Sequence, residues 1–360
     1  MRKVHISSVT PGSKTARPIF TETGSILLGA GIELTPRYLD RLRLMGIDTV
    51  YVEDARTEGI EPIDPISDET RREAVQTIHG TIQQLLKAQD VRSRSSVPMI
   101  GSAFREVFTN ILDDLSSMPN VLVNLTNIQV MEGYLFHHSV NVAVLAGIIG
   151  MARGYNKQQL TDLGVGALLF DVGMTLLPKE LHAHQGPLSE EDWKKVWKHT
   201  EDGFNLLRNQ HDISLLSAHC ALQHHERYDG SGYPRGLKGS EIHEYAQIVG
   251  IADVFDAMTS ARPFRPRHTP SEATEFLFAS GNSKFDIQLI RQFLGHVAIY
   301  PVASTVKLNT GQTGVVARND PRAPHRPVVR ILEEKPGVPV QNPYELDLQK
   351  ETTIVILSSD

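Results

Sequence analysis

Histidine and aspartate side chains fall at the ends of expected helices, or beside glycine-rich turns, in the middle of this sequence. Neutral imidazole and carboxylate groups suit iron, manganese and zinc, and a carboxylate can bridge two ions. Taken one at a time, each histidine is more simply a hydrogen-bonded residue of the core or the surface. Together they could converge on metal and support metal-assisted hydrolysis of a phosphoester. The set is His138, Asp171, His199, His224, His225 and Asp253.

The segment HHERYDGSGYP, from His224 to Pro234, carries the strongest signal. Its two histidines lead directly into a glycine-rich loop that contains an aromatic side chain. Gly230, Gly232 and Pro234 could serve simply as a turn, because Asp-Gly and Tyr-Pro steps are common in loops whatever those loops bind. The run as a whole is long and highly specific.

Three runs of the sequence resemble the HD-GYP family: HHERYDGSGYP, IADVFDAMTSARPFR from Ile251 to Arg265, and FDIQLIRQF from Phe285 to Phe293. The resemblance covers about residues 127–294. Members of this family are metal-dependent phosphodiesterases that open cyclic-di-GMP to the linear dinucleotide or to GMP, on an all-helical domain with a di- or trinuclear metal centre. The resemblance therefore implies divalent metal ions, with iron or manganese expected, and cyclic-di-GMP as the partner.

The same resemblance assigns roles to single residues. The six residues named above match the family's metal ligands, and Asp171 stands in the place of the catalytic aspartate that bridges the metals. Tyr233, Arg262 and Arg265 match residues that contact the cyclic dinucleotide. Arginine can hold a phosphate with two hydrogen bonds and stack on guanine, and tyrosine can stack or donate its hydroxyl. Without the family match, Arg262 and Arg265 would be interpreted as part of a solvated loop.

The sequence departs from the family at its signature dipeptide, which reads Phe170-Asp171. An apolar ring stands where the family supplies an imidazole ligand, and Met174 stands where it has a lysine near the scissile phosphate. A thioether can neither offset developing charge nor protonate a leaving oxygen. Tyr134 replaces a glutamate that members with three metals carry. His137 does not rescue the missing ligand, because neighbouring residues on one helix point about 100° apart; it is interpreted as an interfacial or surface residue.

The elements that position these residues are predicted to be helical. Asn156 and Ser189 look like helix N-caps, and Cys220 lies in an apolar stretch typical of a core. The expected fold class is mainly α, with an all-helical HD-type domain within residues 68–300. Apolar spacing predicts further helices over 69–86, 104–115, 127–153, 213–226, 245–259 and 286–300.

Two small modules are expected to flank the helical region. Residues 1–56 combine strand-like runs at 26–28 and 49–52 with a helix within 34–45, and a linker rich in glycine, proline and acids follows at 57–67. Residues 301–360 form a β-rich extension, with a hairpin turn at Asn309-Thr310-Gly311. Its strand-like runs are 305–308, 313–317, 327–331 and 352–357.

Composition excludes several classes of protein. A net charge of -6 and the absence of a long basic run argue against duplex DNA or RNA as a partner. A single cysteine cannot form an internal disulfide and fits a reducing cytosol. The N-terminus lacks an apolar signal region, and no segment approaches the roughly 20 uninterrupted apolar residues of a membrane span. We expect a cytoplasmic protein of two or three domains, and a homo-oligomer remains open.

The leading hypothesis is a bacterial cyclic-di-GMP signalling protein whose catalytic site is degenerate. The missing ligand predicts weak or absent hydrolysis and fewer than two metal ions, so that the protein would act as a nucleotide receptor or regulator. One alternative is a working cyclic-di-GMP phosphodiesterase in which water or a neighbouring group replaces the lost ligand. Another is an interaction module whose GYP loop binds signalling proteins without nucleotide.

Overall fold

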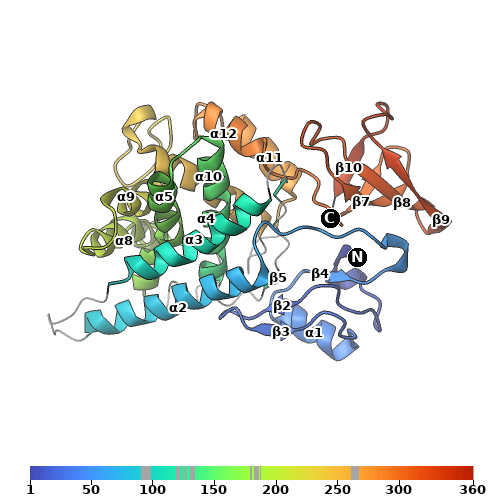
Figure 1. Cartoon of the computed structure of the whole chain (residues 1–360), viewed down its shortest axis with the longest axis horizontal. Coiled ribbons are helices and arrows are strands. Elements are labelled where there is room, and N and C mark those ends of the chain that lie inside the picture. The colour runs from blue at the N-terminus through green and yellow to red at the C-terminus, as the bar shows by residue number, and fades with distance from the viewer. Residues whose placement is uncertain are drawn as a thin grey trace.

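The computed structural model describes residues 1–90, 99–118, 122–123, 125, 128–129, 134–178, 181, 186, 188–260 and 267–359. Its helices form one body, and two smaller parts built around strands lie beside that body (Figure 1). The predicted fold class, mainly α with two small flanking modules, is confirmed. The helices of the body are α2 (Asp68–Asp90), α3 (Gly101–Ser117), α4 (Tyr134–Ala152), α5 (Lys157–Leu169), a 3-10 helix (Val172–Leu176), α7 (Glu190–Trp197), α8 (His199–Leu207), α9 (Leu215–Gln223), a 3-10 helix (Gly239–Glu241), α10 (Glu244–Thr259), α11 (Pro270–Ala279) and α12 (Ile287–Leu294).

Helix α4 forms the centre of the helical body, where it packs against α5 and α10. It is apolar on nearly every side, as expected of a helix enclosed by others. Among the described residues it is the one helix long and apolar enough to cross a membrane by length and composition, but 72% of that window is buried inside the protein. A buried core helix meets the same criteria, so α4 is weak evidence for a membrane span.

The sequence predicts some helix ends correctly and others wrongly. Asn156 forms a capping box at the start of α5, and the Ser189 side chain accepts a hydrogen bond at the start of α7, both as predicted. Of the helix expected over residues 127–153, the described residues place Tyr134–Ala152 in α4. Before it, Ile128–Gln129 forms strand β5, because these residues pair in parallel with β2 (Ile19–Phe20) of the N-terminal module. The spacing of apolar residues within a segment does not predict pairing with a strand that lies far away in the sequence.

The N-terminal module contains two small sheets. Strand β1 (Arg2–His5) pairs with β4 (Thr49–Val52), and β2 pairs with β3 (Ile26–Leu28), all antiparallel. Short 3-10 helices lie at Ile6–Ser8 and Ala55–Thr57, and α1 (Pro36–Leu44) begins at the Thr35 N-cap. The predicted linker at 57–67 is irregular beyond the 3-10 helix, but it is packed rather than solvated, since Ile60 and Ile66 are buried.

The C-terminal module is a five-stranded antiparallel sheet in the order β10-β6-β7-β8-β9. Its strands are β6 (Thr305–Leu308), β7 (Thr313–Arg318), β8 (Val328–Lys335), β9 (Val338–Asp347) and β10 (Ile356–Ser359). The predicted turn joins β6 to β7, with Gly311 at a φ of 88°. Strand β9 was not predicted, because Pro339 and Pro343 interrupt its pattern. Prolines are tolerated there because β9 is an edge strand.

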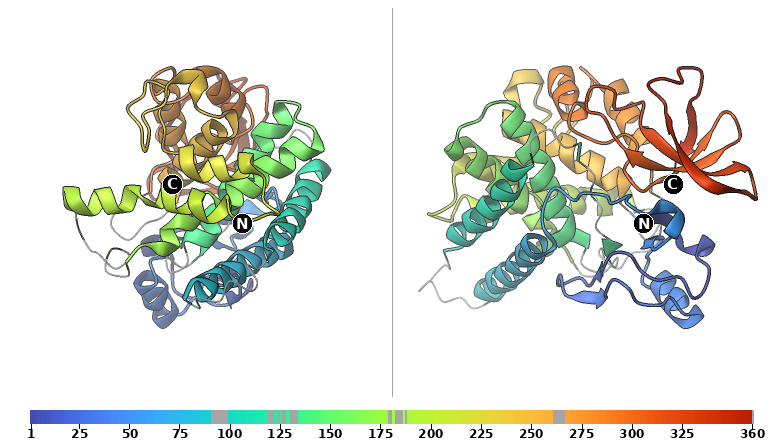
Figure 2. Two further views of the ribbon diagram at one scale, coloured as in Figure 1. Left: turned by 90° about the vertical axis from the view of Figure 1, so that its left-hand side faces the viewer. Right: turned by 45° about the vertical axis from the view of Figure 1, so that its right-hand side comes forward.

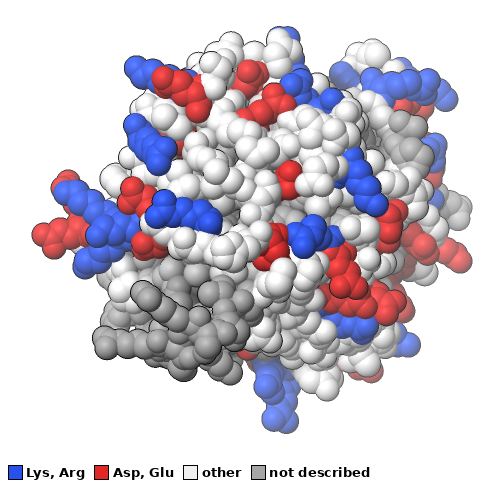
Figure 3. All heavy atoms as spheres, turned by 60° about the vertical axis from the view of Figure 1, so that its left-hand side comes forward, with Lys and Arg blue, Asp and Glu red and all other residues white. Residues whose placement is uncertain are grey.

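The two flanking modules share a hydrophobic core, although they lie at opposite ends of the sequence. Buried residues of β1, α1 and β4 pack with Ala303, Val315 and Leu332, and the Lys3 amide donates to the Ala303 carbonyl at 2.8 Å. Both modules lie on the same side of the helical body (Figure 2). On the face drawn in Figure 3, basic and acidic side chains are interspersed among uncharged ones.

Candidate metal centre

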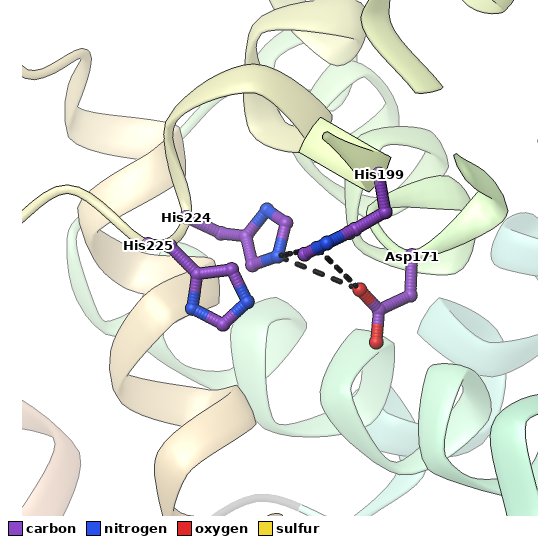
Figure 4. A group of neighbouring side chains, drawn as sticks. All are labelled: Asp171, His199, His224 and His225. Atoms are coloured by element: carbon purple, nitrogen blue, oxygen red, sulfur yellow. Dashed lines mark hydrogen bonds and ion pairs between the residues drawn. The ribbon is translucent and has the colours of Figure 1, made fainter. Parts of the chain in front are cut away.

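Four side chains from three places in the chain converge within the helical body (Figure 4). Asp171 follows the C-cap residue of α5, His199 is the first residue of α8, and His224 and His225 follow the last residue of α9. One ligand atom from each side chain lies within 4.8 Å of those of the other three. The structure thus brings together four of the six residues predicted as metal ligands.

His199 and His224 direct their Nε2 atoms at the same point. These two atoms lie 3.3 Å apart, and they lie 3.3 and 3.5 Å from Oδ1 of Asp171. On the other side of each ring, Nδ1 donates to a backbone carbonyl, His199 to Val196 at 2.6 Å and His224 to Cys220 at 3.0 Å. Because a carbonyl can only accept, each Nδ1 carries the proton, and each Nε2 lone pair faces the shared point.

This arrangement fits a bound cation. Two lone pairs that face each other beside a carboxylate repel unless a proton or a metal ion lies among them. Burial opposes protonation of His199, but Asp171 outweighs burial and raises the pKa of His199. Burial also opposes charge on Asp171, but His199 and His224 hold its pKa well below its usual range. Burial and the neighbouring His224 lower the pKa of His225, which leaves a neutral imidazole. Three imidazoles and one carboxylate suit a divalent first-row metal.

Gly173 allows the backbone beside Asp171 to approach α8 closely. A Cβ atom added at Gly173 would lie 1.9 Å from the carbonyl oxygen of His199 and 2.7 Å from the amide nitrogen of Gly203. No real side chain tolerates these distances, and both partners are backbone atoms that cannot turn aside. A glycine at this position is therefore what lets Asp171 reach His199.

The other two predicted ligands, His138 and Asp253, bond to each other. Nε2 of His138 lies 3.0 Å from Asp253 Oδ1, and its Nδ1 lies 2.6 Å from Asp256 Oδ2. Burial disfavours a charged His138, but the two carboxylates outweigh it and raise its pKa to about 9. Burial likewise opposes charge on Asp253, but His138 lowers its pKa to about 2. His138 therefore contacts two carboxylates at these distances and lies outside the four-residue cluster.

Phe170 lies between these two groups. Its ring meets the His224 ring edge to face, with centroids 4.9 Å apart, and the His138 ring at 5.5 Å. The side chain is fully buried. An apolar ring therefore fills the volume between an imidazole of the four-residue cluster and the imidazole of the ion-paired group.

A buried polar chain extends from His138 toward the N-terminal part of the protein. Asn141 donates to Asp256 at 2.9 Å and accepts from Arg71 at 2.6 Å, and Arg71 also pairs with Asp64 at 3.0 Å. All four side chains are buried. The sequence analysis did not identify this chain, because its members are far apart in the sequence. The only sequence signal for it is that Asp64 and Arg71 lie on either side of the start of α2.

The glycine-rich loop holds Tyr233 against the four-residue cluster. The rings of Tyr233 and His225 stack with centroids 4.6 Å apart, and burial raises the pKa of Tyr233. The carboxylate of Glu226 accepts from the amides of Arg235 and Leu237 at 2.8 and 3.0 Å, which fixes the far side of the loop. Glu226 was missed by sequence reasoning, which treated it as part of the motif without a role of its own.

The remaining predicted residues have separate positions. Arg262 and Arg265 lie outside the described residues. Tyr134 stacks on His138 with ring centroids 4.9 Å apart, and Met174 lies half-buried on the 3-10 helix after Asp171. His137 was interpreted as an interfacial or surface residue, and the structure agrees with the first of these: the side chain is buried, and its Nε2 contacts the Thr21 carbonyl of the N-terminal module at 2.9 Å.

Comparison with protein families gives two matches. A family described as HD domain matches residues 113–289. A family described as KOW domain associated with HD domain matches residues 305–360. The first match contains all four residues of the cluster, and the second covers the C-terminal sheet.

Curated relatives include cyclic di-GMP phosphodiesterases. One from Pseudomonas aeruginosa is 33% identical over 230 residues, which cover 62% of this chain and 55% of the relative. One from Thermotoga maritima is 35% identical and covers 52% of this chain and 51% of the relative. A 3'3'-cGAMP-specific phosphodiesterase of Vibrio cholerae is 33% identical over 43% of this chain and 35% of its own length. The chain thus spans about half the length of the first two.

Among solved structures, a protein of Bdellovibrio bacteriovorus titled a HDG"Y"P protein aligns over 81% of this chain and 97% of its own, with a TM-score of 0.45 and 17% identity. This likeness is too low to bear on function.

Proposed function

We propose, from the premise that the chain belongs to the HD-GYP family, with residues 113–289 as its HD domain, that the protein is a cyclic-di-GMP receptor or regulator with weak or absent phosphodiesterase activity. In this proposal the protein still has a metal site, but the site holds fewer ions than in active members of the family. It also places the protein in the cytoplasm, where its single buried thiol, Cys220, would stay reduced.

The position of Phe170 carries the proposal. Its buried ring contacts both His138 and His224, in the volume that an imidazole ligand would need. A phenyl ring offers no lone pair to a cation, and the two imidazoles that it separates cannot share one through it. We therefore propose that the four-residue cluster holds fewer than two metal ions, with iron or manganese as the family would suggest.

The chain's own residues would hold that ion and orient a phosphodiester. His199, His224, His225 and Asp171 would supply the ligands. A divalent metal held by these residues would polarise a phosphoryl oxygen and make water more acidic. The Val196 and Cys220 carbonyls keep the two Nε2 lone pairs aimed at the site. Met174, beside Asp171, contributes no cation to offset charge that develops on the phosphate.

The proposed ligand contacts come from the loop beside the cluster. Tyr233 stacks on His225 and would contact the cyclic dinucleotide, and we propose Arg262 and Arg265 for its phosphates. These contacts do not need the missing imidazole, which is why binding can persist without turnover. The relatives are named for cyclic-di-GMP and for 3'3'-cGAMP, so both nucleotides belong in any assay.

The test is hydrolysis of cyclic-di-GMP by purified protein loaded with manganese or iron, with metal content measured on the same sample. A Phe170→His, Met174→Lys double variant is assayed beside it. We expect nucleotide binding without turnover in the unaltered protein and turnover in the double variant. Turnover by the unaltered protein at the rate of the double variant would overturn the proposal.

An active phosphodiesterase is the second candidate, and the intact four-residue cluster favours it. Three imidazoles and a carboxylate, whose ligand atoms lie within 4.8 Å of one another, can hold one ion even though position 170 supplies no imidazole. The same assay separates the two candidates, because an active enzyme would release linear dinucleotide or GMP in proportion to its metal content. If the protein instead binds signalling partners but no nucleotide, a pull-down should recover the same amount of partner with and without cyclic-di-GMP.

A further inference from the structure

Three aromatic rings form a stack that leads from the metal cluster to the surface. The rings of His225 and Tyr233 lie 4.6 Å apart with 26° between their planes, and those of Tyr233 and Trp197 lie 5.1 Å apart with 24° between theirs. His225 belongs to the cluster, whereas Trp197 is 43% exposed. The stack therefore joins a candidate metal ligand to an accessible indole through the tyrosine of the GYP loop.

The position of Trp197 is not explained by packing alone. It is the last residue of α7, a helix without a single buried residue, and it lies two positions before His199. A large apolar side chain that served only to fill a core would be expected to be buried. Tyr233 covers part of the indole, and the exposed remainder is surface that a planar ligand can cover. The tyrosine beneath it is held by the loop that Glu226 fixes.

We propose that Trp197 is a binding residue that stacks on a purine base of the cyclic dinucleotide, at the exposed end of the ring stack. This inference rests on the proposed function, since it assumes that a phosphodiester of the same ligand reaches the cluster. Aromatic side chains bind bases through their π-faces, and indole is the largest of them. The exposed indole is two ring contacts, of 5.1 and 4.6 Å, from His225 of the cluster, so one dinucleotide would stack a base on Trp197 while its phosphodiester reaches the cluster.

Stacking also predicts which ligands are accepted. Because every base has a π-face, a stacking surface tolerates guanine and adenine alike. Trp197 should therefore contribute equally to binding of cyclic-di-GMP and of 3'3'-cGAMP, and any discrimination between them must come from other residues. A residue that read the guanine edge by hydrogen bonds would instead favour one of the two.

The chain offers a matched control on the same helix. Trp193 lies one turn before Trp197 on α7 and is similarly exposed, at 46%. The sequence has only these two tryptophans. In a Trp193→Phe variant, fluorescence therefore reports on Trp197 alone, and in a Trp197→Phe variant it reports on Trp193 alone.

The experiment titrates cyclic-di-GMP and 3'3'-cGAMP into the metal-loaded full chain. We expect both nucleotides to quench the Trp193→Phe protein far more than the Trp197→Phe protein. By calorimetry, Trp197→Ala should weaken binding of both nucleotides by about 5- to 150-fold, whereas Trp197→Phe should recover part of the loss and Trp193→Ala should leave affinity unchanged. Metal content equal to that of the unaltered protein shows that each variant retains the cluster.

The outcomes separate the inference from the function on which it rests. Nucleotide binding that is unaffected by Trp197→Ala, or equal quenching of the two single-tryptophan proteins, overturns the role of Trp197 and leaves the receptor function standing. If the metal-loaded unaltered protein binds neither nucleotide, the proposed function fails and the inference fails with it. A loss confined to one nucleotide would show base reading rather than stacking, which also contradicts the proposal.

Discussion

The ring of Phe170 meets the ring of His224 edge to face, with centroids 4.9 Å apart and 87° between the planes. His224 is also the imidazole whose Nε2 faces both His199 and Asp171. An apolar residue that departs from the family pattern thus packs directly on a candidate metal ligand. This contact makes the metal content of the protein the most informative quantity to measure.

Substitution of Phe170 by histidine should raise the metal content of the protein. An imidazole at this position lies between His138 and His224 and supplies a lone pair where the phenyl ring has none. We expect Phe170→His to bind about one more ion per chain, measured by elemental analysis after dialysis. Phe170→Leu is the control, since it shortens the ring without adding a ligand. Equal metal content in the two variants would contradict the proposed role of this position.

The stability of the metal-free protein should depend on pH through His138. Because Asp253 and Asp256 raise the pKa of His138 from 6.5 to about 9, the ion pairs contribute stability that is fully present below pH 6.5 and is lost as pH rises through about 9. Urea unfolding across that range, with metal removed, measures the loss.

His137 provides the control for this titration. Burial lowers its pKa to about 4, so it stays neutral throughout the range. In an Asp256→Asn variant the pKa of His138 should fall, and the decline in stability should begin at lower pH. A stability that stays constant from pH 6.5 to 9 in the unaltered protein would rule out the ion-paired state of His138.

Substitution of Arg71 by methionine should strongly destabilise the protein. Arg71 is 2% exposed and donates to both Asp64 and Asn141, so its loss removes a buried ion pair and a buried hydrogen bond. We expect the free energy of unfolding to fall by about 3–5 kcal/mol. Arg72 is the matched control, because its ion pair with Glu69 is exposed and Arg72→Met should cost about 0–1 kcal/mol. Similar losses for the two variants, by urea unfolding, would show that the buried chain contributes little.

Substitution of Gly173 by alanine should disrupt the cluster. The added Cβ would meet the His199 carbonyl oxygen at 1.9 Å, so the 3-10 helix after Asp171 must move away from α8. We expect lower thermal stability together with a loss of metal binding. Gly80→Ala serves as the control, because a Cβ there meets nothing within 4 Å and alanine favours the helix by about 0.5–1 kcal/mol. Retention of full metal content by Gly173→Ala would show that the close approach is dispensable.

Local sequence determined much of the architecture and part of the site. Asn156 predicts the start of α5, because a capping box depends on residues three positions apart. The adjacent pair His224 and His225 and the loop after them also form a local motif, and the structure places both histidines in the four-residue cluster. These features are fixed by short-range geometry, which a sequence displays directly.

Only the tertiary structure decided how the six predicted ligands are divided. His138 belongs with Asp253 and Asp256, while Asp171 belongs with His199 and His224, because helix packing brings together residues that lie far apart in the chain. The sequence shows that Phe170 replaces an imidazole, but not that its ring fills the space between the two groups. Strand β5, the shared core of the flanking modules and the Arg71–Asn141 contact were unpredictable for the same reason, since each depends on a partner that no local pattern encodes.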